Sequence, residues 1–499
     1  MSFLNKILYL FTGLILIIPI TAYAQQTPRS LTLEEALEIA RKDSPDALNA
    51  KQAFRSSYWQ YRSFKGAYLP NIGMSAEIPN INRTINKTTN PTTGAEIYTP
   101  QQFTNFSSYL SISQRIGFTG GSLSLNTGLE RIQNYFTDST SISYYSTPIN
   151  IEFNQPIFKY NAFKWERKIQ PMVYDIAKRK YLEDIEQVNL TATNYFFNLL
   201  QAQIEKKIAE VYLANYDTLY KIAEGRFQLG KIAQNELLTL KLRVLNGRAA
   251  VENAGLNLDQ SLYRFRSFLR IKDTVPIVLI PPAGLTYFIV DPDRAVELAV
   301  ANSSQSLDFN RRELEAASSV NKAKMDGRFD ANLRAIFGYN QTAPTLSTAY
   351  KSPLDQEIVT LGVTLPILDW GVARGQIKVA ESNEEIEKNK VTQERIDFKR
   401  QVYLLGVQFN MQKNQVMIAS LADTVARQTY EVTKGRYLIG KNITITELNT
   451  AQSETDGAQR DYYSALKTYW STYFDLRKLT LYDFIRNEPL QFSWEDVKP

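Results

Sequence analysis

The 499-residue chain contains neither cysteine nor histidine. Without cysteine, the chain can form no disulfide and offers no N-terminal cysteine for a lipid. Without histidine, it lacks the commonest general base and the usual zinc and copper ligand, so Ser-His and Cys-His nucleophile pairs are excluded. The 51 acidic residues leave catalysis by carboxylates alone open. We nevertheless expect a protein that is not an enzyme and that carries no cofactor.

The charge of the chain is nearly balanced, with 57 basic and 51 acidic residues and a net charge of +6. The two signs are interspersed, so we expect no nucleic-acid partner. After residue 24, no apolar run approaches the roughly 18–20 residues of a transmembrane helix. The mature chain is therefore expected either to be soluble outside the cytoplasm or to enter a membrane as β-strands.

The first 24 residues have the pattern of a secretory signal peptide. Lys6 supplies the positive charge, Ile7–Ile20 is an apolar run, and Ala22 and Ala24 form a small-residue cleavage site before Gln25. The alternative is an uncleaved membrane anchor, for which the apolar run is short. We predict cleavage after residue 24.

The chain repeats itself. A Gly-Arg-Phe-Gln-Leu-Gly-Lys segment that starts at Gly225 recurs as Gly-Arg-Tyr-Leu-Ile-Gly-Lys from Gly435, 210 residues later. Upstream, Glu35–Ala40 parallels Arg294–Ala299 at an offset of 259, so the first copy is longer by 49 residues. Repetition of this size predicts that one long structural unit occurs twice in the chain. We place the copies at 25–289 and 290–482, followed by a tail at 483–499.

Each copy has the pattern helix, strands, very long helix, turn and long helix. A capping box of Thr32 and Glu35 predicts a first helix through Ala67, and Asp291 opens its counterpart, which is expected to run to about Lys324. More than 60 helical residues would span on the order of 90–100 Å. Together with the helices that return after them, they predict antiparallel hairpins of coiled-coil type. The expected long and returning helices cover Asn161–Glu224, Glu236–Leu269, Val372–Val432 and Thr446–Leu479.

Strands are expected at about 71–156 and 331–366, where apolar and small polar residues alternate. Runs of about 9–11 such residues are typical of transmembrane β-strands, although one-sided antiparallel sheets show the same alternation. Polar segments at Pro79–Gln102 and around Asp355 are expected to be loops between strands. The 49 additional residues suit two further strands, which would make six in the chain instead of four, or alternatively a separate folded hairpin.

Signal peptide, doubled plan, alternating strands and glycine motifs together resemble the TolC-type outer membrane efflux protein family, over essentially the whole mature chain. The resemblance implies an α+β fold: an oligomeric transmembrane β-barrel continued by a long periplasmic α-helical (coiled-coil) barrel, with two structural repeats per chain. Four to six strands cannot close a barrel with a usable lumen, and open sheet edges are not tolerated in lipid. The strands therefore also favour an oligomer.

The resemblance further implies a homotrimer in outer membrane lipid that extends into the periplasm. Its partners would be a periplasmic adaptor (membrane fusion) protein and an inner-membrane transporter. The expected function is a passive exit duct for a tripartite efflux pump or a type I secretion system. Two alternatives stay open: a soluble periplasmic coiled-coil adaptor or scaffold protein, and an exported hydrolase that depends on carboxylates.

Candidate functional residues come from the hairpin ends. Gly230 and Gly440 are expected to end helices in a left-handed conformation. In the family these turns contact the adaptor, which carries over to Arg226, Phe227, Leu229, Gly230, Lys231, Arg436, Tyr437, Ile439, Gly440 and Lys441. The family often has an acidic residue six positions after the glycine, which here falls on Glu236 and Thr446. Candidates for the aperture or lumen are Glu236, Thr446, Glu447 and Asn449, although acids at a helix N-terminus also stabilise the helix itself.

Overall fold

The computed structural model describes residues 29–136, 138–272, 275–282, 288–439, 443–493, 495 and 497. The expected signal peptide at 1–24 lies outside the described residues. The chain divides into two compact units. One comprises Met1–Ala47, Val188–Tyr287 and Gln412–Ser471, and the other Leu48–Gln187, Phe288–Met411 and Thr472–Pro499. None of the described helices has a segment long and apolar enough to cross a membrane.

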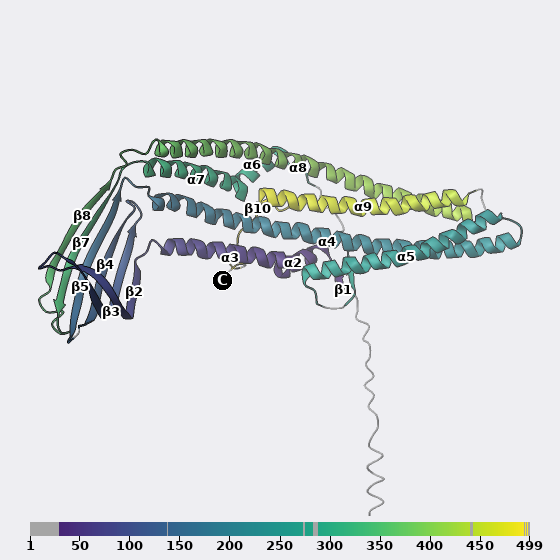
Figure 1. Ribbon diagram of the computed structural model, residues 1–499. Helices are drawn as coiled ribbons and strands as arrows, with labels where there is room; N and C mark the ends of the chain where they lie inside the picture. The colour runs from purple at the N-terminus through teal and green to yellow at the C-terminus, as the bar shows by residue number, and fades with distance from the viewer. Residues whose placement is uncertain are drawn as a thin grey trace, which may run out of the picture. The chain divides into compact units, whose positions relative to one another are not determined.

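The doubled plan predicted from the sequence is confirmed by the helices, whose lengths match between the copies (Figure 1). Both very long helices have 67 residues, and both helices that follow them have 36. The first copy contains α2 (Leu33–Asp43), α3 (Pro45–Gly66), α4 (Ala162–Gln228) and α5 (Gln234–Leu269). The second contains α6 (Pro292–Asn302), α7 (Ser304–Asp326), α8 (Val372–Leu438) and α9 (Ile445–Thr480). The offset of 210 therefore relates α4 to α8 and α5 to α9.

The first helix of each copy is interrupted, whereas the sequence pattern predicted it to be continuous. Ser44 is extended, with φ −64° and ψ 148°, because the residue before a proline is kept out of the helical region by Pro45. Ser303 is extended in the same way, and its side chain accepts a hydrogen bond from the backbone N–H of Ser306. Each break thus starts a new capped helix, α3 or α7.

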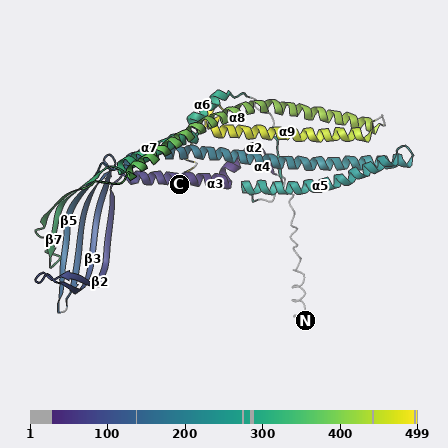
Figure 2. The ribbon, with the colours of Figure 1, turned by 45° about the horizontal axis from the view of Figure 1, so that its top comes forward.

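In the first unit, two helical hairpins form a common core. The pairs α4–α5 and α8–α9 each run antiparallel in both views (Figures 1 and 2). Beside them, the short strands β1 (Arg29–Leu31) and β6 (Ile277–Leu279) pair in parallel. The buried core residues come from all four helices and are Tyr216, Leu219, Ala223, Leu240, Val244, Tyr430, Ile445, Leu448 and Ala451.

The second unit contains one antiparallel sheet of six strands in the order β2-β3-β4-β5-β7-β8. The first copy contributes four strands and the second contributes two, so the 49 additional residues do supply two further strands. The strands are β2 (Asn71–Thr89), β3 (Glu96–Ile116), β4 (Gly121–Tyr135), β5 (Thr140–Ile157), β7 (Asp330–Ala343) and β8 (Leu354–Thr364).

The expected loop at Pro79–Gln102 is wrong, since most of it is strand. The pairing of β2 with β3 continues to Thr89 and Glu96, which leaves a turn of six residues. Asp355 likewise lies in β8, where it pairs with Tyr339. The polar composition of these segments favoured loops in the sequence prediction, but each segment is held in an extended conformation by pairing within its own β-hairpin.

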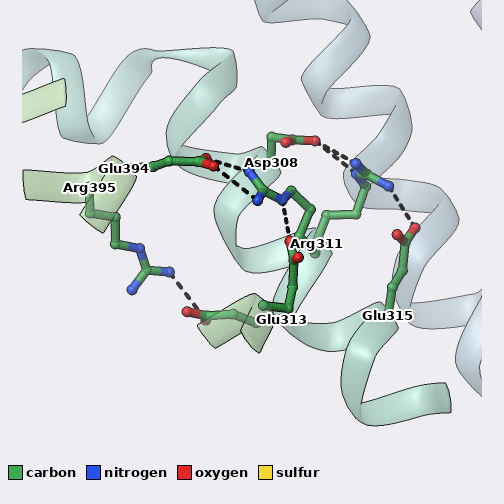
Figure 3. A network of polar contacts seen from close by, with 8 residues as sticks. Asp308, Arg311, Glu313, Glu315, Glu394 and Arg395 are labelled. Atoms are coloured by element: carbon green, nitrogen blue, oxygen red, sulfur yellow. Dashed lines mark hydrogen bonds and ion pairs between the residues drawn. The ribbon is translucent and has the colours of Figure 1, made fainter. Parts of the chain in front are cut away.

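Helices α7 and α8 of the second unit are joined by ion pairs (Figure 3). Arg312 Nε lies 2.6 Å from Glu387 Oε1, and its Nη1 lies 2.5 Å from Glu394 Oε2. Arg395 of α8 lies 3.2 Å from Glu313 of α7. The Arg312 side chain also lowers the pKa of Glu394 through its hydrogen bonds.

The end of α9 carries a buried charged cluster. Arg477 bonds to Glu186 of α4 at 2.9 Å and to Asp483 of β9 (Tyr482–Asp483) at 3.0 Å. Asp483 also accepts from the hydroxyl of Tyr473 at 2.7 Å. The strand β9 pairs with β10 (Glu488–Pro489). Because each charge in the cluster has an opposite charge or a hydrogen bond, the chain can turn here with charged groups buried.

Candidate functional site

The first hairpin turn, Leu229–Ala233, is shaped by a helix cap. Gly230 has φ +66°, its N–H bonds to Phe227 O at 2.9 Å, and the N–H of Lys231 bonds to Arg226 O at 2.9 Å. This hydrogen-bond pair is the Schellman motif, which favours glycine in the left-handed position. An added Cβ on Gly230 would meet nothing within 4 Å, so conformation and not space requires the glycine.

The candidate tip residues around this turn are largely exposed. Phe227 and Leu229 present apolar surface, and the Lys231 side chain lies in solvent. In the second turn, Arg436 and Ile439 are exposed while Tyr437 is half-buried. Gly440 and Lys441 lie outside the described residues. Both tips thus offer exposed apolar and basic side chains to a partner.

Arg226 links the two hairpins. Its guanidinium lies 5.9 Å from the centre of the Tyr437 ring, and Nη2 donates to the backbone oxygen of Leu438 at 3.4 Å. A cation over an aromatic face is attracted by the ring quadrupole. Burial raises the pKa of the Tyr437 hydroxyl, while the charge of Arg226 opposes that rise. Arg226 is therefore a contact between α4 and α8 as well as a tip residue.

The four aperture candidates have different surroundings. Glu236 is exposed in the first turn of α5, and Thr446 is exposed in the first turn of α9. Glu447 is held in a capping box with Thr444: its carboxylate accepts from Thr444 N at 2.8 Å, and its own N–H donates to Thr444 Oγ1 at 3.2 Å. The structure brings Thr446 and Glu447 to the start of one helix and leaves Glu236 on the other hairpin.

Asn449 belongs to a polar layer between the hairpins that sequence reasoning missed. Its side-chain oxygen accepts a hydrogen bond from the hydroxyl of Tyr216. In the same layer, Asn215 donates to the Tyr430 hydroxyl at 3.0 Å and accepts from Lys434 Nζ at 3.2 Å. Burial raises the pKa of Tyr430 to about 12. The only sequence signal for this layer is that polar residues occupy helix positions otherwise filled by apolar ones.

The six-stranded sheet has two chemically different faces. The register of the strands aligns the apolar residues with one another across the sheet, and most of their side chains are exposed. This apolar face comprises Ile72, Met74, Leu110, Ile112, Leu123, Leu125, Ile151, Phe153, Leu333, Phe337, Val359, Leu361 and Val363. The polar face comprises Ser75, Glu77, Ser107, Tyr109, Ser111, Ser113, Ser124, Asn126, Glu130, Asn150, Glu152, Arg334, Gln356 and Thr360. A sheet with one face for lipid and one for water has this character.

Glycines inside the strands lie on the polar face, where two of them make room for side-chain contacts. A Cβ on Gly128 would lie 2.3 Å from the Tyr109 ring, which rests on this glycine and donates to Glu130 at 3.2 Å. Gly338 lies between Asn150 and Gln356, whose side chains bond across it at 3.2 Å. These contacts hold polar side chains along the wall of the sheet.

The chain is similar to a known protein family. The family model described as outer membrane efflux protein matches residues 36–269 and 332–480. No curated protein sequence matches the chain.

Several solved structures share the fold at low sequence identity. The Campylobacter jejuni CmeC outer membrane channel is 15% identical with a TM-score of 0.62, over 90% of this chain and 85% of that chain. The Vibrio cholerae outer membrane protein VceC is 12% identical with a TM-score of 0.63, over 92% and 97%. The open state of the Neisseria gonorrhoeae MtrE outer membrane channel is 13% identical with a TM-score of 0.57, over 90% and 88%. The expected α+β fold with two repeats is confirmed.

Proposed function

The chain belongs to the outer membrane efflux protein family, and we propose that it forms the passive exit duct of a tripartite efflux pump or a type I secretion system in the outer membrane. Family and fold are those of a channel. Beyond the family and the fold, we propose the oligomeric state, the location in the outer membrane and the partner proteins. The observation that carries it is the six-stranded sheet with one exposed apolar face and one polar face.

The two edges of that sheet support a homotrimer. Among the described residues, β2 and β8 each pair with a single strand, so their outer edges need partners before the sheet can lie in lipid. Three copies supply 18 strands, with β8 of one copy beside β2 of the next. At the usual strand spacing and tilt, such a barrel would have a diameter on the order of 35 Å. The polar face, with Glu77, Glu152 and Arg334, would line the lumen.

Membrane insertion and assembly are tested together. The full-length chain is expressed in a Gram-negative host, and the outer membrane fraction is extracted with detergent. We expect an oligomer of three chains that conducts ions after reconstitution into a planar bilayer. Recovery of a monomer that stays soluble in the periplasm without detergent would contradict the proposal and would favour a soluble adaptor or scaffold.

We propose that the exposed hairpin tips receive a periplasmic adaptor. Arg226, Leu229 and Lys231 of the first tip and Arg436 and Ile439 of the second combine positive charge with exposed apolar surface. The double variant Leu229→Asp/Ile439→Asp is expected to leave the oligomer in the outer membrane but to abolish transport by the native host. Val278→Asp is the control, because this exposed apolar residue lies in β6, away from the turns.

The same experiment separates the two kinds of system. In a deletion strain of the native host, loss of a tripartite efflux pump would increase sensitivity to small toxic compounds. Loss of a type I secretion system would remove a polypeptide from the culture medium. If neither phenotype follows deletion, the proposed exit duct is wrong. If the double aspartate variant restores transport fully, the proposed docking role of the tips is wrong.

A further inference from the structure

The hairpin of β2 and β3 extends beyond the rest of the sheet. The pairing of β3 with β4 ends where Phe103 lies opposite Asn134, whereas the pairing of β3 with β2 continues to Glu96 and Thr89. Beyond Phe103, the two strands pair only with each other among the described residues. We call residues 80–102 the arm. The arm is a two-stranded ribbon that projects past the ends of the other strands.

The arm is a stiff ribbon and not a loose loop. Its backbone pairing continues without a further irregularity up to the turn at residues 90–95. Across the two strands, the side chain of Asn86 donates a hydrogen bond to Gln101. In the turn, the side-chain oxygen of Asn90 accepts from the backbone N–H of Thr92 at 2.9 Å. These hydrogen bonds let the arm keep its shape away from the sheet.

The arm bends out of line with the sheet at a β-bulge. Between Glu77 and Asn80, β2 has one residue more than β3, and bulges bend the strands that contain them. Figures 1 and 2 both show the arm crossing over the ends of the neighbouring strands.

The side chains at the bend indicate its direction. On the polar face, Ser107 is only 7% exposed, and Asn80 Nδ2 donates to Glu77 Oε2 at 3.3 Å. On the opposite face, Ile81 is 64% exposed. Side chains crowd together on the inside of a bend and spread apart on its outside. The arm therefore bends toward the polar face of the sheet.

The arm is long enough to reach the middle of the barrel. From Asn80 to Thr89, its first strand extends about 30 Å at roughly 3.4 Å per residue. The radius of an 18-stranded barrel is about 18 Å, half of the diameter given above. Three arms that bend toward the lumen would therefore meet near the threefold axis.

We propose that the three arms form a lid over the extracellular mouth of the duct, in which each arm contacts the arms of the other two copies. This lid rests on the proposed function, because it requires the trimer and a lumen lined by the polar face. The lid keeps bulky solutes outside the cell from entering the barrel, while small molecules pass between the arms.

The end of the arm suits a contact between identical copies. Around a threefold axis each residue approaches its own copies, so a charged tip would repel itself. The turn at residues 90–95 contains no charged residue, and the nearby Lys87 forms an ion pair with Glu96 of the same arm. Hydroxyl groups such as those of Thr92 and Thr93 both donate and accept, so identical groups can bond to one another.

A lipid surface is the other partner that the arm could meet. The face opposite the polar one carries Ile81, Arg83 and Ile85, a mixture of apolar and basic side chains that suits lipid headgroups. This face would lie on the membrane if the arm bent outward. The bend toward the polar face turns it away from the membrane, so we favour the lid.

The position of the arms is tested with single cysteines, because the chain itself contains none. Intact cells that carry Thr92→Cys are treated with a thiol crosslinker of short reach. The control is Ser139→Cys in the turn between β4 and β5, since residues on the rim of the barrel would lie about 30 Å from their copies. We expect roughly fivefold more covalent dimer from Thr92→Cys. Arms that lie outward on lipid would give no dimer.

The barrier is tested by shortening the arm. Residues 83–102 are replaced by Asn-Gly, which joins the paired residues Asn82 and Phe103 by a two-residue turn. Ser111→Cys on the polar face is then labelled from outside with a bulky dye-linked maleimide. We expect labelling roughly fivefold faster than with the full arm, and equal labelling of the two forms by the small reagent N-ethylmaleimide. Ser139→Cys is the control, since the bulky reagent should label it equally in both forms.

The lid requires both results, and lysine-directed crosslinking of the extracted channel reports the trimer separately. Suppose that the trimer is present and that N-ethylmaleimide labels Ser111→Cys. If Thr92→Cys then gives no more dimer than its control, or if the bulky reagent labels both forms at one rate, the lid is wrong and the proposed function stands. If only monomers are found, or if N-ethylmaleimide does not label Ser111→Cys, the proposed function fails and the lid fails with it.

Discussion

Asn449 of α9 accepts a hydrogen bond from the hydroxyl of Tyr216 of α4, 233 residues earlier in the chain. Tyr216 belongs to the same buried core as Leu219 and Leu448, so the pair joins the two hairpins at this core. Asn449 was expected from its place after the glycine motif to be a candidate for the aperture or lumen. Its hydrogen bond makes it in addition a contact between α4 and α9, so any change at the tip that separates these helices must break it.

Removing the Tyr216 hydroxyl should weaken the contact between α4 and α9 near the ends of the hairpins. Tyr216→Phe leaves the Asn449 oxygen without this donor, at an expected cost of about 1–2 kcal/mol. We expect faster hydrogen–deuterium exchange in peptides covering 445–455 and a higher probability of the conducting state in planar bilayers. Tyr220→Phe is the control, because the Tyr220 hydroxyl has no hydrogen bond within the described part of the chain. Equal exchange in the two variants would show that the Tyr216–Asn449 bond does not hold the hairpins together.

The cluster around Asp483 should make stability depend on acid. Burial raises the pKa of Asp483, but hydrogen bonds from Arg486 N–H and Tyr473 and the charge of Arg477 outweigh burial, so the net effect lowers the pKa. A carboxylate with a lowered pKa in the folded state stabilises the fold above its unfolded pKa of about 3.9. That stabilisation is lost as the pH falls below this value and through the folded pKa.

Asp483→Asn should therefore lower the unfolding temperature at pH 7, by an amount that shrinks below about pH 4. Thermal unfolding of the detergent-solubilised protein between pH 3 and pH 7 measures the difference. Asp475→Asn is the control, because Asp475 pairs with Lys478 three residues along the same helix, and such pairs contribute little to stability. A difference between wild type and Asp483→Asn that is constant over this pH range would contradict the prediction.

Two adjacent arginines on α7 should differ in their effect on α8. Arg312 bonds to Glu387 and Glu394 of α8, whereas Arg311 bonds to Asp308 and Glu315 of its own helix (Figure 3). Arg312→Gln should therefore weaken the contact between the helices by roughly 1 kcal/mol, since the groups are only partly buried. Hydrogen exchange of α7 peptides should increase several-fold in Arg312→Gln and change little in Arg311→Gln. Equal increases would mean that the inter-helix ion pairs do not hold α7.

A single methyl group on the polar face of the sheet should narrow the lumen. The Cβ of Gly128→Ala would lie 2.3 Å from the Tyr109 ring, so the ring has to leave the wall and give up its hydrogen bond to Glu130. We expect a measurable fall in single-channel conductance. Gly73→Ala is the matched control, because it lies on the same face and its Cβ meets nothing within 4 Å. Unchanged conductance in Gly128→Ala, or an equal fall in both variants, would place the polar face elsewhere than in the lumen.

Features with a local cause were predicted well from the sequence. The helical hairpins follow from apolar spacing of three and four residues, and the ends of α4 and α5 lie within four residues of the expected positions. The two faces of the strands follow from alternation. The matching helix lengths of the copies follow from the repeat. In each case the signal lies within one element, or is repeated in the second copy.

Features decided by pairing between segments were not predicted. The segment 79–102 is polar enough to be a loop, but its two ends pair with each other across residues 90–95, which makes most of it part of β2 and β3. The break between α6 and α7, before Ser304, contains no proline, so the local sequence does not predict it. The contact of Arg226 with Tyr437 joins residues 211 positions apart in the chain, so no local pattern could show it.

The sequence alone determined that this chain is a duplicated unit of long helical hairpins and two-faced strands, because periodicity and repetition are properties of the order of residues. Only the tertiary structure decided which hairpin sides are buried and which stay exposed. Leu238 and Leu448 occupy the same place in the repeat, and nothing in their local sequence separates them. Their burial differs because Leu448 packs in the core with residues of α4 and α5, whereas Leu238 lies on an exposed side of α5.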